Sequence, residues 1–182
     1  KSQEKQAEAV PFFAKIAAEH AASPLAAEAA FHVGEDQYDK KKYAEAAKSY
    51  AAVKEKSPGG ELGEKATYKL GWSHFQQKQY ADALTNFSEQ IAAFPQGPLA
   101  ADAIFMKAES LFRQEAYKEA WPAYQAAVKT KASTPAIEVL MLLHGGQSAA
   151  QLKLWDESLK LLAAIPEKFP ESPLLSEAIY EA

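Results

Sequence analysis

Apolar residues recur along the chain at a helical spacing, and the clearest example lies between Lys65 and Pro95. From Tyr80 onward, apolar side chains stand at i, i+3, i+4 and i+7, which is the period of one helix face and not the alternation of a strand. The first half of the stretch has the same period around Gly71. Because only the short polar segment 76–79 separates the two halves, we predict two antiparallel helices joined by a short turn.

Four residues of this stretch are expected to control how the two helices pack. Gly71 has no side chain and Ala83 has a small one, so the helices can approach closely at these positions. Phe87 is the large residue that we expect to fill the remaining space. Pro95 is expected to end the second helix, because proline cannot continue a helix.

The same features return along the chain at a fixed step, with a period of about 37 residues. The close-approach, small and large positions are occupied in turn by Gly34, Gly71, Ala108 and Gly145, by Ala46, Ala83, Ala120 and Ser158, and by Tyr50, Phe87, Tyr124 and Leu162. In the fourth copy we place one extra residue between Gly145 and Trp155. Self-similarity at such a period is typical of a stacked array of repeats.

The pattern LG-x11-A-x3-F-x7-P in 70–95 resembles the tetratricopeptide repeat (TPR), a helix–turn–helix unit. The usual TPR period is slightly shorter, at about 34 residues, and the extra residues of each copy fall in the links between copies. Links such as Pro170-Glu171-Ser172-Pro173-Leu174 resemble one branch of the family, which includes the Tol-binding cell-division coordinator and the β-barrel-assembly lipoprotein of the bacterial envelope. The resemblance implies an all-α fold, a right-handed superhelix (α-solenoid) of antiparallel helix pairs.

We therefore expect residues 1–182 to form a single array of repeats. The expected division is 1–22 as the second helix of a partial repeat, full repeats at 24–58, 61–95, 98–132 and 135–170, and the start of a further repeat at 173–182. Because the sequence begins and ends within a repeat, we expect it to be a piece of a longer array.

Composition excludes several classes of function. The formal net charge is −4 with both signs mixed along the chain, which is unlike the basic surface of a nucleic-acid binder. The absence of cysteine excludes disulfides, thiolate metal sites and cysteine nucleophiles. No apolar run is long enough to cross a membrane, and the N-terminal residues lack the apolar core of a signal peptide.

The chain shows no pattern typical of an enzyme. Its four histidines occupy non-equivalent positions in different repeats, so we interpret them as residues on helix faces and expect no metal site. Carboxylates such as Glu45 and Glu157 are expected on solvated faces. No glycine-rich phosphate loop or nucleophile elbow is present. We therefore predict no catalysis and no cofactor.

The resemblance also implies a binding site, because the first helices of TPR units line a concave groove. Carried onto this sequence, the partner-binding positions are Phe31, Glu35, Tyr38, Tyr68, Trp72, Phe75, Phe105, Glu109, Phe112 and Arg113. The aromatic residues either pack between repeats as core or form an exposed floor, with Trp72 as the best candidate anchor. Acids outnumber bases five to two at the groove positions (Glu28, Glu35, Asp39, Asp102 and Glu109 against Lys65 and Arg113). Such a groove favours an apolar partner segment that carries Lys or Arg.

From these features we predict that the protein is a non-catalytic scaffold that holds a segment of a partner protein. The branch resemblance implies a role in assembly or division of the bacterial cell envelope, in the periplasm or at the outer membrane, with the cytoplasm as the alternative. Two other hypotheses remain open. One is a structural module that forms homo-oligomers through exposed repeat ends. The other is a regulatory or targeting region of a larger protein.

Overall fold

The computed structural model describes residues 2–20, 23 and 25–181. Over these residues the regular structure is entirely α-helical: α1 (Ser2–Glu19), α2 (Ala26–Asp39), α3 (Tyr43–Lys56), α4 (Gly60–Gln76), α5 (Tyr80–Ala93), α6 (Ala100–Arg113), α7 (Tyr117–Val128), α8 (Pro135–Gln151), α9 (Trp155–Lys168) and α10 (Leu175–Glu181). The predicted bounds at 1, 22, 24 and 182 lie outside the described residues. The division of the chain into repeats stays a prediction.

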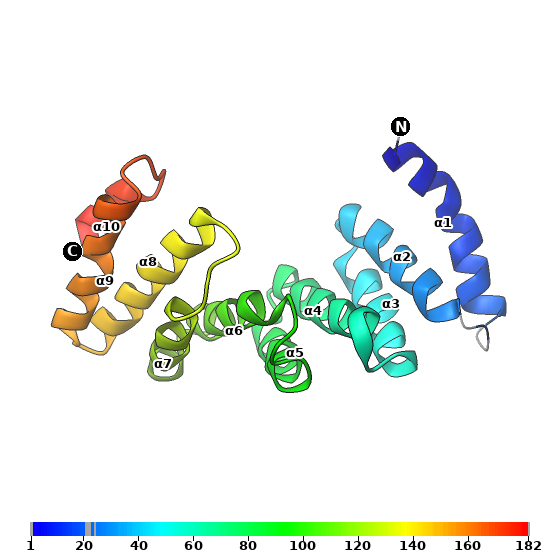
Figure 1. Cartoon of the computed structure of the whole chain (residues 1–182), viewed down its shortest axis with the longest axis horizontal. Helices are drawn as coiled ribbons and strands as arrows, with labels where there is room; N and C mark the ends of the chain where they lie inside the picture. The colour runs from blue at the N-terminus through cyan, green and yellow to red at the C-terminus, as the bar shows by residue number, and fades with distance from the viewer. Residues whose placement is uncertain (1, 21–22, 24, 182) are drawn as a thin grey trace. The chain divides into compact units, whose positions relative to one another are not determined.

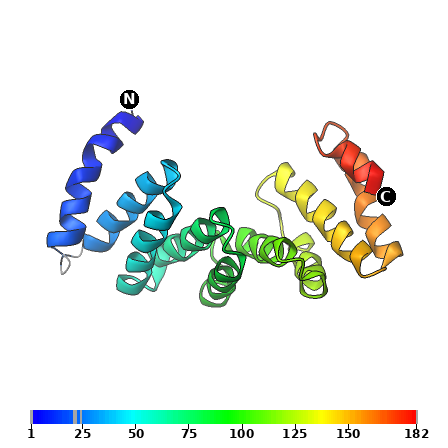
Figure 2. The ribbon, with the colours of Figure 1, turned by 180° about the vertical axis from the view of Figure 1, so that it is seen from behind.

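The helices group into two compact units, Lys1–Leu99 and Ala100–Ala182. In the first unit, α1 to α5 form a row in which each helix packs against the next along the chain (Figure 1). In the second unit, α6 to α10 pack in the same sequential way, and α6 also contacts α8 (Figure 2). Each unit is thus built from antiparallel helix pairs, as the sequence predicts.

Four helix-to-helix turns share one backbone conformation. Lys41, Lys78, Glu115 and Lys153 all have a positive φ of 58–61°. The residue after each of them donates its N–H to the carbonyl five residues back, as in the bond from Gln79 to His74. This is the Schellman ending of a helix, where glycine is the usual residue because it has no Cβ. The chain instead uses lysine or glutamate at all four turns.

The predicted packing of the first two helix pairs is confirmed by the contacts of their glycines. A Cβ added at Gly71 would lie 2.8 Å from Cε1 of Phe87, and one at Gly34 would lie 2.8 Å from Cε1 of Tyr50. The residues at the predicted small and large positions are all buried. A side chain in place of either glycine would therefore push the paired aromatic ring out of its site.

One prediction about the fourth copy is wrong. Gly146, and not Gly145, occupies the close-approach position, because a Cβ there would lie 2.7 Å from Cγ of Leu162. The separation in sequence between Gly146 and Leu162 equals that between Gly71 and Phe87. The extra residue of this copy therefore lies before Gly146.

A serine in three first helices gives the same register. The hydroxyl groups of Ser73, Ser110 and Ser148 each donate to the carbonyl four residues back, and all three serines are buried. Ser148 lies one residue further along the chain from Ser110 than Ser110 lies from Ser73. The shift by one residue is thus complete before Ser148.

Candidate functional site

The ten predicted partner-binding residues lie in both units and differ in how deeply they are buried. The six in the first unit are half-buried on α2 and α4. In the second unit Phe105 and Glu109 are buried, Phe112 is half-buried and Arg113 is exposed. The lone chain thus leaves part of eight of these side chains accessible, and their role in binding stays a prediction.

An aromatic row follows α4 in the first unit. The ring centroid of Trp72 lies 6.4 Å from that of Tyr68 and 5.8 Å from that of Phe75, both in edge-to-face geometry. Tyr68 also contacts the buried ring of Phe87, at 5.9 Å. These contacts fix the rings against one another and against the core. The row therefore serves packing and still presents ring surface that a ligand can reach.

Glu35 is tied to two other side chains of the first unit. Its carboxylate accepts the hydroxyl of Tyr50, and its Oε1 lies 3.0 Å from Nζ of Lys69 on α4. Nζ of Lys69 also lies 5.1 Å from the ring centroid of Tyr38. Burial, and then the hydrogen bond to Glu35, raise the pKa of Tyr50 far above its usual range. Glu35 is thus a paired structural acid and contributes little negative charge to a groove.

Glu109 is buried at the corresponding place in the second unit. Its Oε1 accepts the hydroxyl of Tyr124 at 2.5 Å and lies 2.5 Å from Nδ1 of His144 on α8. Phe112 stacks on the His144 ring at 4.5 Å, with an angle of 10° between the planes. Nε of Arg113 lies 3.9 Å from the other carboxylate oxygen. Burial and Glu109 together raise the pKa of Tyr124 well above its usual range.

These contacts locate His144 and correct one expectation from the sequence. His144 lies on a face of α8 that is buried between Phe112 and Glu109. The carboxylates are not all on solvated faces. Besides Glu109, the carboxylate of Glu64 is buried and accepts Nε2 of Gln90 and the backbone N–H of Leu99.

The glutamate–tyrosine pair appears in alternate copies of the repeat. The pair of Glu35 with Tyr50 and the pair of Glu109 with Tyr124 are separated by two steps of the repeat. In each case the carboxylate also binds a nitrogen of the next first helix, from Lys69 or His144. The copy between them has Trp72 and Phe87 at these positions. The equal separation of glutamate and tyrosine in the two pairs was the available signal in the sequence.

The acidic character expected of the groove is therefore reduced. In the second unit, Glu109 is buried. In the first unit, Glu35 is paired, so the exposed acids among the groove positions of that unit are Glu28 and Asp39. Lys65, the base predicted there, forms an ion pair with Glu61.

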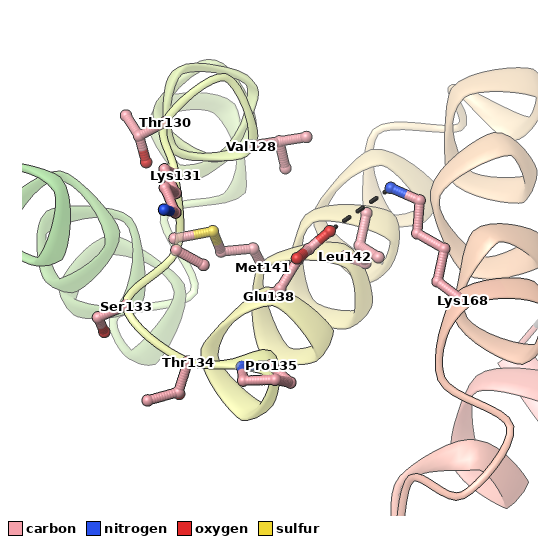
Figure 3. A pocket seen from close by; sticks show the side chains of 11 residues that line it. Val128, Thr130, Lys131, Ser133, Thr134, Pro135, Glu138, Met141, Leu142 and Lys168 are labelled. Carbon is pink, nitrogen blue, oxygen red and sulfur yellow. Dashed lines mark hydrogen bonds and ion pairs between the residues drawn. The ribbon is translucent and has the colours of Figure 1, made fainter.

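Three hollows lie away from the predicted residues. One, of about 360 Å³, lies between α3 and α4 in the first unit. Two others flank the start of α8 in the second unit. One has a volume of about 300 Å³ (Figure 3), and the other has a volume of about 420 Å³. None of the ten predicted residues lines any of the three. Within the described residues, no cluster of three or more His, Asp or Glu side chains could hold a metal ion, and no helix is long and apolar enough to cross a membrane.

Comparison with known proteins identifies a family and several structures with a similar fold. The model of the YfiO family, described as outer membrane lipoprotein, matches residues 24–179. No curated protein sequence matches the chain. Among solved structures, the chain is similar to YrrB, described as a TPR protein with an unusual peptide-binding site, with 18% identity and a TM-score of 0.78 over 98% of this chain and 86% of that one.

Two further structures are similar over most of the chain. MamA protein is 19% identical with a TM-score of 0.74, over 100% of this chain and 89% of that one. PilF of Pseudomonas aeruginosa is 18% identical with a TM-score of 0.68, over 86% of this chain and 67% of that one. These similarities confirm the predicted all-α TPR solenoid.

Proposed function

The chain belongs to the YfiO family of outer membrane lipoproteins, and on that premise we propose that it is a protein–protein interaction scaffold of the bacterial cell envelope. The observation that carries the proposal is the half-buried aromatic row of Tyr68, Trp72 and Phe75 on α4. A segment of a partner protein would lie against this row. The periplasm or the outer membrane surface is the proposed location, with the cytoplasm as the alternative.

The geometry of the row suits it to binding. Its rings are held by edge-to-face contacts, so little side-chain freedom is lost when a ligand covers them. Aromatic side chains that become fully covered usually supply most of the binding energy of an interface. Trp72 has the largest side chain of the row and is the proposed anchor. That the similar protein YrrB is described as having a peptide-binding site supports the choice of a peptide segment as the ligand.

The charged side chains at the groove positions determine which kind of partner segment is preferred. Glu28 and Asp39 are the exposed acids of the groove positions in the first unit, and Lys65 is paired with Glu61. We therefore propose an apolar segment with Lys or Arg for this unit. In the second unit, Phe112 and Arg113 are proposed to contact the partner, while the buried Phe105 and Glu109 hold them in position.

The proposal is tested with two single tryptophan variants. Trp72→Ala removes the proposed anchor, and Trp155→Ala, which removes a 63% exposed tryptophan on α9, is the matched control. Both are used with the wild-type chain as baits for a detergent extract of cell envelopes, after circular dichroism shows that they are folded. A partner recovered by wild type and Trp155→Ala is then purified, and its affinity is measured by calorimetry. Equal affinity for Trp72→Ala would contradict the proposal.

A second candidate, self-association, is favoured by one observation. Ile179 and Tyr180 on α10 are apolar and 59% and 88% exposed. Sedimentation velocity over a range of concentrations tests this candidate, with Tyr180→Ser as the variant that should dissociate an oligomer. If the chain is monomeric at the highest concentration, self-association is excluded. A regulatory or targeting role within a larger protein stays an alternative to both.

A further inference from the structure

The second helix of the third copy ends early. Helix α7 has 12 residues and ends at Val128, whereas α3, α5 and α9 each have 14. The link 129–134 then leads to α8, which begins at Pro135 after the capping residue Thr134. The third copy therefore lacks the last half-turn that the second helices of the other copies have.

The third copy also lacks the aromatic residue that follows the second helix in two other copies. Phe94 follows α5 and Phe169 follows α9, and the register of the repeats places Lys131 at the same position. Phe169 packs against the buried cluster that includes Ile165 and Ala178. The third copy has no aromatic ring for this place.

The first copy shows how the same place can be closed without a ring. Ser57 stands at this position there, and its link runs tightly over α4. A Cβ added at Gly63 would lie 2.4 Å from the carbonyl oxygen of Ser57. In the fourth copy the residue at the position of Gly63 is Glu138, whose long side chain reaches instead toward Lys168 on α9.

A hollow of about 300 Å³ results in the third copy (Figure 3). Met141 and Leu142, which are 1% and 3% exposed, form its apolar floor, and Val128, 39% exposed, lies at its side. Met141 replaces the alanine found at this place on other first helices, such as Ala103, and it fills only part of the space. The volume is at the lower end of the range of ligand pockets.

The charge at the rim of the hollow is positive although the chain is acidic overall. Lys131 and Lys168 line it, with Glu138 as the single acid. Lys168 and Glu138 are 3.5 Å apart and both about half-exposed, so their pairing is weak. Within the described part of the chain, Lys131 has no ion pair.

We propose that this hollow binds the aromatic side chain of an acidic peptide segment from a partner protein. The ring would take the place that Phe94 and Phe169 fill in their own copies, and carboxylates beside it would meet Lys131 and Lys168. The unbranched side chain of Met141 can adjust to the shape of the ring. The site is separate from the aromatic row on α4 and prefers the opposite charge, so it extends the proposed function.

The test uses the two methionines of the chain, Met106 and Met141, as reporters. The chain is labelled with ¹³C at the methionine methyl groups, and Met106→Leu assigns the two signals. The probe is the peptide acetyl-Asp-Glu-Phe-Glu-Asp-amide. We expect a saturable shift of the Met141 signal by the ring current of the bound phenylalanine, while the Met106 signal stays in place.

Two control peptides separate the ring from the charges. Replacing phenylalanine by alanine should weaken binding at least about tenfold, because a buried aromatic side chain contributes that much to affinity. Replacing the four acids by lysine should remove binding, and added salt should weaken binding of the acidic peptide. An unchanged Met141 signal at millimolar peptide, or equal shifts with the alanine or lysine peptide, would overturn the proposal.

Variants of the chain give an independent readout. Lys131→Phe places the chain's own ring in the hollow and should abolish the Met141 response while raising the melting temperature. Lys131→Gln keeps the hollow and should only weaken binding, and Lys118→Gln, an exposed position on α7, should bind as the wild type does. Trp72→Ala should also bind as the wild type. A Met141 response that survives in folded Lys131→Phe, or is lost in Trp72→Ala, would refute this site without touching the proposal for α4.

Discussion

Glu109 on α6 and His144 on α8 are joined through the carboxylate Oε1 and the ring Nδ1, which lie 2.5 Å apart in a buried site. The two helices are the first helices of consecutive repeats in the second unit. Tyr124 on α7, between them in sequence, donates its hydroxyl to the same oxygen. One carboxylate thus connects three consecutive helices, and the same arrangement occurs around Glu35 in the first unit with Tyr50 and Lys69.

Removal of the shared carboxylate is expected to destabilise the second unit. Glu109→Ala leaves the Tyr124 hydroxyl and His144 without their acceptor, and each buried unsatisfied group costs about 1–3 kcal/mol. We expect a total loss of roughly 2–5 kcal/mol in the free energy of unfolding, measured by urea denaturation. Glu157→Ala, an exposed acid on α9, is the control and should change stability by less than about 0.5 kcal/mol. Equal effects of the two variants would contradict a structural role for Glu109.

The large buried residues of the helix pairs give a second prediction. Phe87 and Tyr50 are both fully buried, so Phe87→Ala and Tyr50→Ala should each cost about 3–5 kcal/mol in the free energy of unfolding. Phe12→Ala, at a 71% exposed ring on α1, is the matched control and should cost far less. A loss under about 1 kcal/mol at both buried positions in denaturant melts would contradict the packing of the repeats.

The paired glycines of α8 give a direct test of the corrected register. Alanine at either position gains about 1 kcal/mol of helix propensity. At Gly146 the new methyl group meets Cγ of Leu162 at 2.7 Å, and overpacking of this kind costs about 1–3 kcal/mol. At Gly145 the nearest atoms, of Leu161 and Tyr124, are 3.2 Å away.

Gly146→Ala should therefore be less stable than Gly145→Ala by about 1–2 kcal/mol. Urea denaturation of the two variants side by side provides the measurement. The reverse order would restore the register in which Gly145 faces Leu162.

Sequence reasoning worked where the signal was local and failed where it depended on a neighbouring repeat. The helix pairs and the contact of Gly71 with Phe87 follow from spacing within one copy. The register of the fourth copy does not follow from spacing within one copy, because two adjacent glycines fit the pattern equally well. Only the position of Ser148 distinguishes the two possible registers. The burial of Glu109 was missed because one of its partners, His144, lies on a helix of the next repeat, and a carboxylate is normally expected in solvent.

The tyrosines bonded to the buried glutamates predict how stability depends on pH. Burial and the neighbouring carboxylates raise the pKa of Tyr50 and Tyr124 above the usual range, and burial raises the pKa of Tyr38. In the unfolded chain a tyrosine loses its proton near pH 10. Above that pH the unfolded state binds fewer protons than the folded state, so the free energy of unfolding falls as pH rises. The stabilisation is complete below pH 10 and decreases above it, by up to about 1.4 kcal/mol per pH unit for each such tyrosine.

Urea denaturation at a series of pH values from about 8 to 11.5 measures this slope. Tyr50→Phe keeps the ring but has no ionisable group, so its stability should fall less steeply above pH 10 than that of the wild type, although it begins lower because Glu35 loses a donor. Tyr180→Phe is the matched control, since its ring is 88% exposed, and its slope should equal that of the wild type. Equal slopes for all three proteins would mean that the Tyr50 phenol is free to ionise in the fold. The hydrogen bond to Glu35 would then not hold its proton.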